Sequence, residues 1–397
     1  MITAKSAWTT VAELPLRLPA VLRRSVPAIT AGALAGILTV LLETSYAALI
    51  FSGELAPYLS RGVSMILAGT VVAVLLSTLF ASRPGVVSLP QDTPVAILAT
   101  VSSALLVAGR GSITVDQTFH LVAWVVVLST VATALLFLLA GHLRLARVAR
   151  YIPYPVVGGF LAGIGWLFLK GGVELMIGFW PTLVRFHLLL EGYTLLQWLP
   201  GFLFGLLLLL VARRSKSVLS LPAAILGGVL LFYLILLISG LSLAEARASG
   251  WLFGGTGARR LWLPLSRQSF AAVRWEFVPT VLGKLGSLIL VSLLAVLLNI
   301  SGIELFTGFD LDPDRELRML GATGLLVGAV GGPAAYHSLS YSSLTARLGG
   351  QTRLAGWITA LVCASALLAG ARFVSYFPRP VLGALTVYMG ASFLLDW

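Results

Sequence analysis

The sequence predicts an all-α polytopic membrane protein. Hydrophobic residues make up 58% of the 397-residue chain and charged residues only 11%, whereas soluble domains carry about 25% charged residues. So few charges cannot cover a surface that faces water, and the mean hydropathy of +0.98 agrees with this. The apolar residues also collect into long runs with basic residues between them, which is the pattern of membrane-spanning helices.

Twelve apolar runs are candidate spans, because a helix needs about 20 residues to cross a bilayer. In chain order they are 26–51, 59–81, 94–108, 119–141, 154–179, 195–212, 218–240, 277–300, 316–331, 334–348, 353–371 and 380–397. The third and the tenth hold only 15 residues each. At about 1.5 Å per residue, each reaches about 22 Å, less than the hydrocarbon core of about 30 Å.

The basic residues predict the orientation of the chain. Lys and Arg number 27 against 15 Asp and Glu, a formal net charge of +12. If every run crosses, four basic groups fall on one side: Arg17, Arg23 and Arg24; Arg144, Arg147 and Arg150; Arg213, Arg214 and Lys216; and Arg347 with Arg353. We therefore expect an integral protein of a bacterial inner membrane with a cytoplasmic N-terminus. Clustering between apolar runs indicates topology, so we expect no nucleic-acid partner; the lipid bilayer is the expected surrounding.

Metal and disulfide chemistry find little support in the sequence. The chain has one cysteine, Cys363, which lies inside an apolar run and cannot form an internal disulfide. The four histidines are scattered, and none stands at zinc-ligand spacing with a cysteine. We expect neither a metal nor a cofactor.

The two short runs begin alike. Both follow a Gly/Pro-containing break and open with proline and polar residues, in "SLPQDTPVAIL" and "GGPAAYHSLSYSSL". Interrupted backbone at membrane depth is tolerated only where it is buried in protein or lines a water-filled cavity. A pair of such segments at corresponding places in two halves is typical of a transporter site built from inverted repeats.

Both breaks have the residues of helix starts. Pro94 fits the first helical position, with Thr93 or Asp92 as the N-cap. Ser338 and Ser340 offer hydroxyl groups near the second start. Two helix N-termini that point at one spot form an anion site, because each carries a partial positive charge. The candidate substrate-binding residues are Gln91, Asp92, Thr93, Tyr336, His337, Ser338, Leu339 and Ser340.

Some of these residues have a structural interpretation as well. Asp92 is equally explained as a plain helix cap, and His337 as a structural contact. Ser342, Ser343 and Thr345 lie further along and are expected to bond back to their own helix.

Glu43 is the only acid well inside the first run. An ionisable group at that depth costs about 2.5–3.5 kcal/mol on insertion scales, so it is expected to face a cavity, protonated or paired. Glu43 and Asp92 are the candidates for binding a coupling proton or ion, with a structural hydrogen bond as the alternative for Glu43. The catalytic set is empty, because we expect no enzyme.

Four stretches resemble the sulfate permease (SulP) family of anion transporters. They are "RLARVARYIPYPVVGGFLAGIG", "DLDPDRELRMLGATGLLVGAVGG", "GGPAAYHSLSYSSLTARLGGQTRLAG" and "YFPRPVLGALTVYMGASFLLDW". The resemblance implies a seven-plus-seven inverted-repeat fold, in which a core domain moves against a gate domain and the substrate sits between two half-helices that meet mid-membrane. It also implies a homodimer, and two further helices and a cytoplasmic STAS domain after Trp397. We therefore expect a chain truncated after about twelve spans.

The resemblance divides the chain into six parts. Residues 1–25 are a cytoplasmic lead-in, 26–141 the first core repeat and 142–240 the first gate repeat. Residues 241–276 are an extracellular loop, 277–371 the second core repeat, and 372–397 the start of the second gate repeat.

The site departs from the family pattern in its charges. Family members often carry an arginine where this chain has Tyr341, and proton-coupled members a glutamate where it has Ala295. The first hypothesis is secondary, elevator-type transport of a small inorganic or carboxylate anion of the sulfate, bicarbonate, chloride and dicarboxylate class, coupled to protons or sodium. The alternative is a cationic or zwitterionic solute such as a basic amino acid, which the acids favour. The stretch "LLNISGIEL" also resembles a fungal vacuolar branch.

A hydrolase built on "YHSLS" is the third hypothesis and the weakest. The chain has no G-x-S-x-G elbow. On a helix, the neighbours His337 and Ser338 would project about 100° apart.

Overall fold

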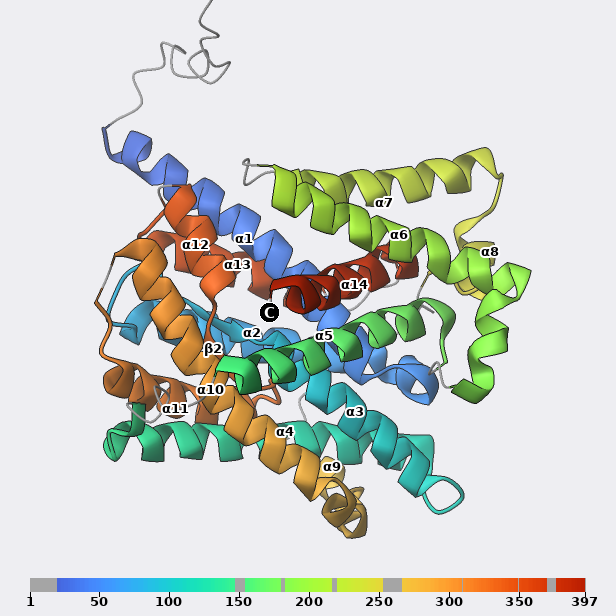
Figure 1. Cartoon of the computed structure of the whole chain (residues 1–397), viewed down its shortest axis with the longest axis horizontal. Coiled ribbons are helices and arrows are strands. Elements are labelled where there is room, and N and C mark those ends of the chain that lie inside the picture. Colours follow the sequence, from blue (N-terminus) through green and yellow to red (C-terminus); the bar gives the residue numbers. More distant parts are fainter. Residues whose placement is uncertain are drawn as a thin grey trace, which may run out of the picture.

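The computed structural model describes residues 20–146, 154–179, 183–215, 220–252, 266–308, 310–348, 350–369 and 376–396. Within them, twelve helices correspond to the twelve predicted runs (Figure 1). They are α1 (Ala20–Ile50), α2 (Leu59–Phe80), α3 (Asp92–Gly109), α4 (Val115–His142), α5 (Tyr154–Ile177), α6 (Gly192–Arg214), α7 (Ser220–Ile238), α10 (Leu282–Thr307), α11 (Pro313–Ala329), α12 (Leu339–Arg347), α13 (Arg353–Ala369) and α14 (Arg379–Asp396).

Shorter elements connect these helices. They are the 3-10 helices Gly53–Tyr58, Leu183–Leu190 and Trp275–Val281, and the helices α8 (Leu243–Ala248) and α9 (Arg267–Ala271). The predicted loop 241–276 therefore contains helical turns, although residues 253–265 lie outside the described residues. The N-terminal lead-in up to residue 19 also lies outside them. Among the described helices, seven are long and apolar enough to cross a membrane. The chain is an integral membrane protein.

One feature of the fold is not helical and was not predicted. Strand β1 (Ser88–Pro90) pairs antiparallel with β2 (Ala335–His337), with Ser88 opposite His337 and Leu89 opposite Tyr336. The pairing continues at both ends, where Gln91 N donates to Ala334 O at 3.3 Å and Ser338 N donates to Val87 O at 3.1 Å. β1 leads directly into α3, which has 18 residues, and β2 leads into α12, which has nine. This two-stranded sheet has only three residues per strand, too few to show the alternation that marks a strand. The rest of the architecture is the predicted helical one.

The helices pack in a pattern that repeats between the two halves. α1 packs against α12 and α13, and in the second half α10 packs against α3 and α4. In the same way α2 packs against α13, and α11 packs against α4. Each of these four contacts thus has a counterpart with the halves exchanged, which is the geometry of an inverted repeat.

A second group of helices lies beside these eight. It consists of α5, α6, α7 and α14, with α14 against both α5 and α6. Figure 1 shows α6, α7 and α8 together at one corner of the molecule, away from α4 and α11 at the opposite edge. Small residues bring α5 and α14 close, because a Cβ on Gly165 would lie 2.7 Å from the carbonyl oxygen of Gly390.

Glycines also allow the close approach that ends α11. The helix stops at Ala329, and Gly331 adopts a positive φ of 91° that favours glycine. A Cβ on Gly332 would lie 2.6 Å from the Cα of Gly69 in α2. The break predicted at Gly331 and Gly332 therefore exists and packs directly on α2.

Candidate substrate cavity

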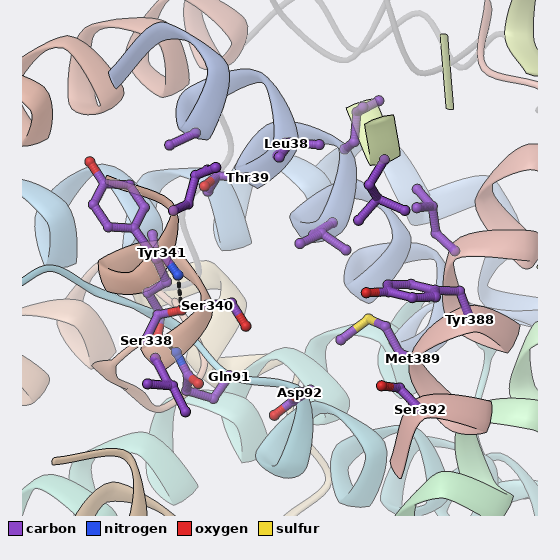
Figure 2. Close-up of a pocket in the computed structure, with 18 of the residues that line it drawn as sticks. Leu38, Thr39, Gln91, Asp92, Ser338, Ser340, Tyr341, Tyr388, Met389 and Ser392 are labelled. Carbon is purple, nitrogen blue, oxygen red and sulfur yellow. Dashed lines mark hydrogen bonds between the residues drawn. The ribbon is translucent and has the colours of Figure 1, made fainter. Parts of the chain in front are cut away.

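A cavity of about 600 Å³ lies between the two helix groups. On one side it is lined by α1, α10 and the starts of α3 and α12, and on the other by α14 and the connection between α6 and α7. Figure 2 shows Gln91, Ser338 and Ser340 on one side, Tyr388, Met389 and Ser392 on the other, and Asp92 between them.

The predicted site residues converge on this cavity with one exception. The lining includes Gln91, Asp92, Thr93, Tyr336, Ser338, Leu339 and Ser340, together with Glu43. These residues come from α1, from the β1–α3 segment and from the β2–α12 segment, which are far apart in the sequence. Their place on the wall is an observation; their contact with a substrate stays a prediction.

The start of α3 differs in detail from the prediction. The helix begins at Asp92 with Gln91 as its N-cap residue, so Pro94 occupies the third helical position rather than the first. Gln91 does not cap with its side chain. Its Nε2 donates to Leu89 O at 2.8 Å and to Tyr336 O at 3.1 Å, and its Oε1 accepts from Asn299 Nδ2 at 3.4 Å. Asp92 Oδ1 accepts from the backbone N of Thr93 at 2.8 Å. Asp92 therefore stabilises the helix start with one oxygen while its side chain remains part of the cavity wall.

The start of α12 agrees with the prediction. Ser338 is the N-cap, and its Oγ accepts from the backbone N of Tyr341 at 3.2 Å (dashed line in Figure 2). Ser342 and Ser343 donate to the carbonyl oxygens of Ser338 and Ser340, at 2.9 Å and 3.0 Å. The expected back-bonding is thereby confirmed. α12 itself has only nine residues, fewer than the fifteen predicted.

His337 is the exception, because it does not line the cavity. Its side chain is fully buried, and its Nε2 lies 2.7 Å from Oε2 of Glu316. Successive side chains on a strand point to opposite faces, so Tyr336 and Ser338 face the cavity while His337 faces the protein interior. The prediction that His337 contacts a substrate is corrected in favour of the structural contact.

Glu43 and Asp92 are the two acidic side chains among the described lining residues. Glu43 is 2% exposed, and its Oε2 has no hydrogen-bond partner among the described residues. Asp92 is close enough to interact electrostatically with it. The described lining residues include no lysine or arginine. Positive potential in the described cavity wall comes instead from the unpaired N–H groups at the starts of α3 and α12.

Several lining residues were not predicted. Asn299 of α10 donates through Nδ2 to His337 O at 2.8 Å and to Gln91 Oε1 at 3.4 Å. A lone amide in the apolar stretch "LLAVLLNISG" was the available signal. The wall formed by Tyr388, Met389 and Ser392 had no such signal, because these residues look like an ordinary apolar helix. Within the described chain, no group of three or more His, Cys, Asp or Glu residues could hold a metal.

Two paired half-helices, an inverted repeat and a cavity between two helix groups define a membrane transport domain. Residues 27–397 match the Sulfate permease family, and the chain belongs to that family.

Solved structures support the same fold. The transmembrane domain of the cyanobacterial bicarbonate transporter BicA matches with a TM-score of 0.70 at 19% identity, over 95% of this chain and 90% of that one. The structure of SLC26A9 matches with a TM-score of 0.69 at 16% identity, over 94% of this chain and 58% of that one. The predicted inverted-repeat transporter fold is confirmed, and identities this low are evidence for the fold alone.

Curated relatives differ in the substrates that their names give. The vacuolar basic amino acid transporter VSB1 of Saccharomyces cerevisiae is 26% identical over 387 residues, 93% of this chain and 36% of the relative. The bicarbonate transporter BicA of Synechocystis is 26% identical over 346 residues, 83% of this chain and 56% of the relative. The chain therefore spans less than two thirds of the length of either protein.

Proposed function

We propose that the chain exchanges protons for a small solute that carries both a carboxylate and a cationic group, with a basic amino acid as the type. The observation that carries this proposal is the cavity lining, which has two carboxyl groups and, among the described residues, no basic side chain. This reverses the order of the two transport hypotheses from the sequence.

The cavity offers a separate partner for each end of such a solute. The carboxylate would accept hydrogen bonds from N–H groups and hydroxyls at the starts of α3 and α12, including Ser340, which is exposed. The cationic end would pair with Glu43 and Asp92. Tyr46 and Tyr388 also line the cavity, and aromatic faces attract ammonium and guanidinium groups.

Glu43 supplies the reason for exchange. An ionised carboxylate inside the membrane is costly, so it needs either a proton or the cation of the substrate. The proton and the substrate cation neutralise the same carboxylate, so only one of them can be bound to Glu43 at a time. Movement of the site in either state then carries a proton one way and a cationic solute the other.

The cavity extends toward one end of α1 and not toward the other, which supports an alternating-access mechanism. Along α1 the cavity extends from Tyr46 back to Ala35, and it reaches Ser215 and Ser220 at the α6–α7 connection. Beyond Tyr46 the residues from Ala47 to Phe51 are buried. With the predicted orientation, the open side is cytoplasmic. We propose that the core (26–141 and 277–371) moves against the gate (142–240 and from 372) as an elevator.

The other side is closed by contacts that α1 and the segment directly after it make with α5. Leu49 packs on Gly171, where a Cβ would collide with it. The Oγ of Ser52 donates to Oε1 of Glu174 at 2.8 Å. These contacts join the proposed core to the proposed gate, so they must break when the cavity opens to the opposite side.

A small anion is the second candidate, and the two helix N-termini favour it. Bicarbonate transporters are among the relatives, and converging N-termini bind an anion without a formal cation. In this case Glu43 would carry a proton together with the anion, and the proton gradient would act with the opposite sign.

Uptake into proteoliposomes separates the two candidates. The solutes are radiolabelled arginine, bicarbonate, sulfate, chloride and succinate, each tested with the lumen acidic and with the exterior acidic. We expect arginine to accumulate when the lumen is acidic, because protons leave as arginine enters. Accumulation of an anion driven by an acidic exterior, with no arginine movement, would overturn the proposal in favour of the second candidate. Liposomes without protein are the control.

A further inference from the structure

Three buried side chains form a polar chain behind the β1–β2 pair. His337 Nε2 lies 2.7 Å from Glu316 Oε2, and His337 Nδ1 lies 3.2 Å from Ser88 Oγ. Ser88 and His337 are 0% exposed and Glu316 is 1% exposed. The three residues come from β1, β2 and α11, and none of them lines the substrate cavity.

The order Ser, His, Glu is that of a charge-relay triad, but the burial excludes that chemistry here. A nucleophilic serine must meet its substrate, whereas Ser88 has no exposed surface. Ser338, the serine next to His337 in the sequence, has its Oγ engaged as the cap of α12. A role in positioning remains.

Glu316 holds the lead-in segments of both half-helices. Its Oε2 lies 2.7 Å from Nε2 of His337 in β2, the strand that leads into α12. Its Oε1 accepts from the backbone N of Ser82 at 3.1 Å, in the segment that leads to β1 and α3. His337 then joins the two strands to each other through Ser88, which is its direct partner in the register.

Neighbouring helices complete the support. The Oγ of Ser77 in α2 accepts from the backbone N of Ser88 at 2.9 Å. Asn299 of α10 donates to the carbonyl oxygen of His337 at 2.8 Å. Side chains from α2, α10 and α11 thus fix a sheet of only six residues, which is far too short to be stable alone.

We propose that Glu316, His337 and Ser88 are positioning residues that set the register of β1 on β2 and thereby aim both half-helices at one cavity. A slip of one residue would turn Tyr336 and Ser338 away from the cavity, because side chains alternate along a strand. Removing one partner leaves the other buried without its hydrogen bond or charge partner, so the loss of either residue is costly. The proposal rests on the proposed function only in taking the cavity as the substrate site.

A disulfide in place of the histidine contact tests this role. Residues directly opposite each other in an antiparallel pair have Cα atoms about 4.5–5.5 Å apart, within the range of a disulfide. The test variants are His337→Ala and the double variant Ser88→Cys/His337→Cys. The chain has one native cysteine, Cys363, which is buried, so the new bond is unambiguous.

Two measurements are made on each variant. For the solute that the wild type takes up, we expect His337→Ala to raise KM about tenfold and to change Vmax by less than about twofold, because the site is loosened rather than removed. Hydrogen exchange of the peptides that cover 86–92 and 334–341 should become faster. The oxidised double variant should recover the wild-type KM and protection, and the reduced form should behave like His337→Ala.

Three results would overturn the proposal: wild-type KM and protection in His337→Ala, an oxidised double variant that stays impaired, or a reduced one that is already normal. Glu304→Gln is the matched control, because Glu304 also holds a backbone N–H, that of Leu311 at 2.9 Å, but contacts neither strand. If the wild type transports none of the tested solutes, the proposed function fails. The hydrogen-exchange measurement then still decides whether these residues set the register.

Discussion

Replacing Glu43 by glutamine is the most direct test of how the cavity recognises a charged solute. The change keeps the shape of a side chain that is 2% exposed, so packing is preserved while the charge and the titratable proton are lost. In the wild type, Oε2 of Glu43 has no partner among the described residues and the side chain faces the cavity. Under the proposed function, the cation of the substrate would be the partner of this oxygen.

The size of the effect follows from that missing partner. A hydrogen bond to a charged group contributes about 1.5–3 kcal/mol. At about 1.4 kcal/mol per factor of ten, KM for arginine should rise about ten- to 150-fold in Glu43→Gln. Because glutamine does not take up a proton in this pH range, the stimulation of uptake by an acidic lumen should disappear as well.

The KM for arginine and the effect of the pH gradient are both obtained from initial uptake rates in proteoliposomes. These rates are measured over a range of arginine concentrations, with and without the gradient. Glu304→Gln is the matched control, because it removes the same charge from the end of α10 outside the cavity lining. An arginine KM within about twofold of wild type, with the gradient effect intact, is far below the change expected from a lost charged hydrogen bond and would refute the role given to Glu43.

Two further predictions concern packing and access. Gly69→Ala places a Cβ against the Cα of Gly332, so α2 must shift and the protein should lose about 1–3 kcal/mol of stability, seen as a lower midpoint of thermal unfolding. Gly163→Ala, where the new Cβ meets open space, should not lower the midpoint, and equal midpoints for the two variants would contradict the argument. Crosslinking of Ser52→Cys/Glu174→Cys with a short, reducible bis-thiosulfonate reagent should stop uptake until a reductant is added, because it holds the segment after α1 to α5. Full uptake by the crosslinked protein would show that this contact does not need to open.

The parts of the site that could be predicted depend on local chemistry. Ser338 was identified as a helix-start residue because a hydroxyl beside a Gly/Pro break has little other use at membrane depth. Glu43 was identified because an acid in an apolar run must avoid lipid. In both cases the reason lies within a few residues of the position itself, so it is visible in the sequence.

The parts that could not be predicted depend on partners far away in the chain. For His337, the sequence leaves the cavity and a structural contact equally open, since its partners Ser88 and Glu316 are 249 and 21 residues away. The pairing of β1 with β2 shows no alternating pattern over three residues per strand. Tyr388 and Met389 carry no local mark of the cavity, because only the packing of α14 decides which face meets it.

The β1–β2 pairing also has a consequence for how the protein is made. The backbone N of Gln91 and the carbonyl of Val87 find their partners in Ala334 and Ser338, which leave the ribosome 243 and 251 residues later. Until then these groups lie at membrane depth without their final hydrogen bonds, at a cost of several kcal/mol for each unsatisfied group. The first half of the chain therefore cannot complete the hydrogen bonds of its β1–α3 segment during synthesis, and β2 supplies the missing partners when the second half inserts.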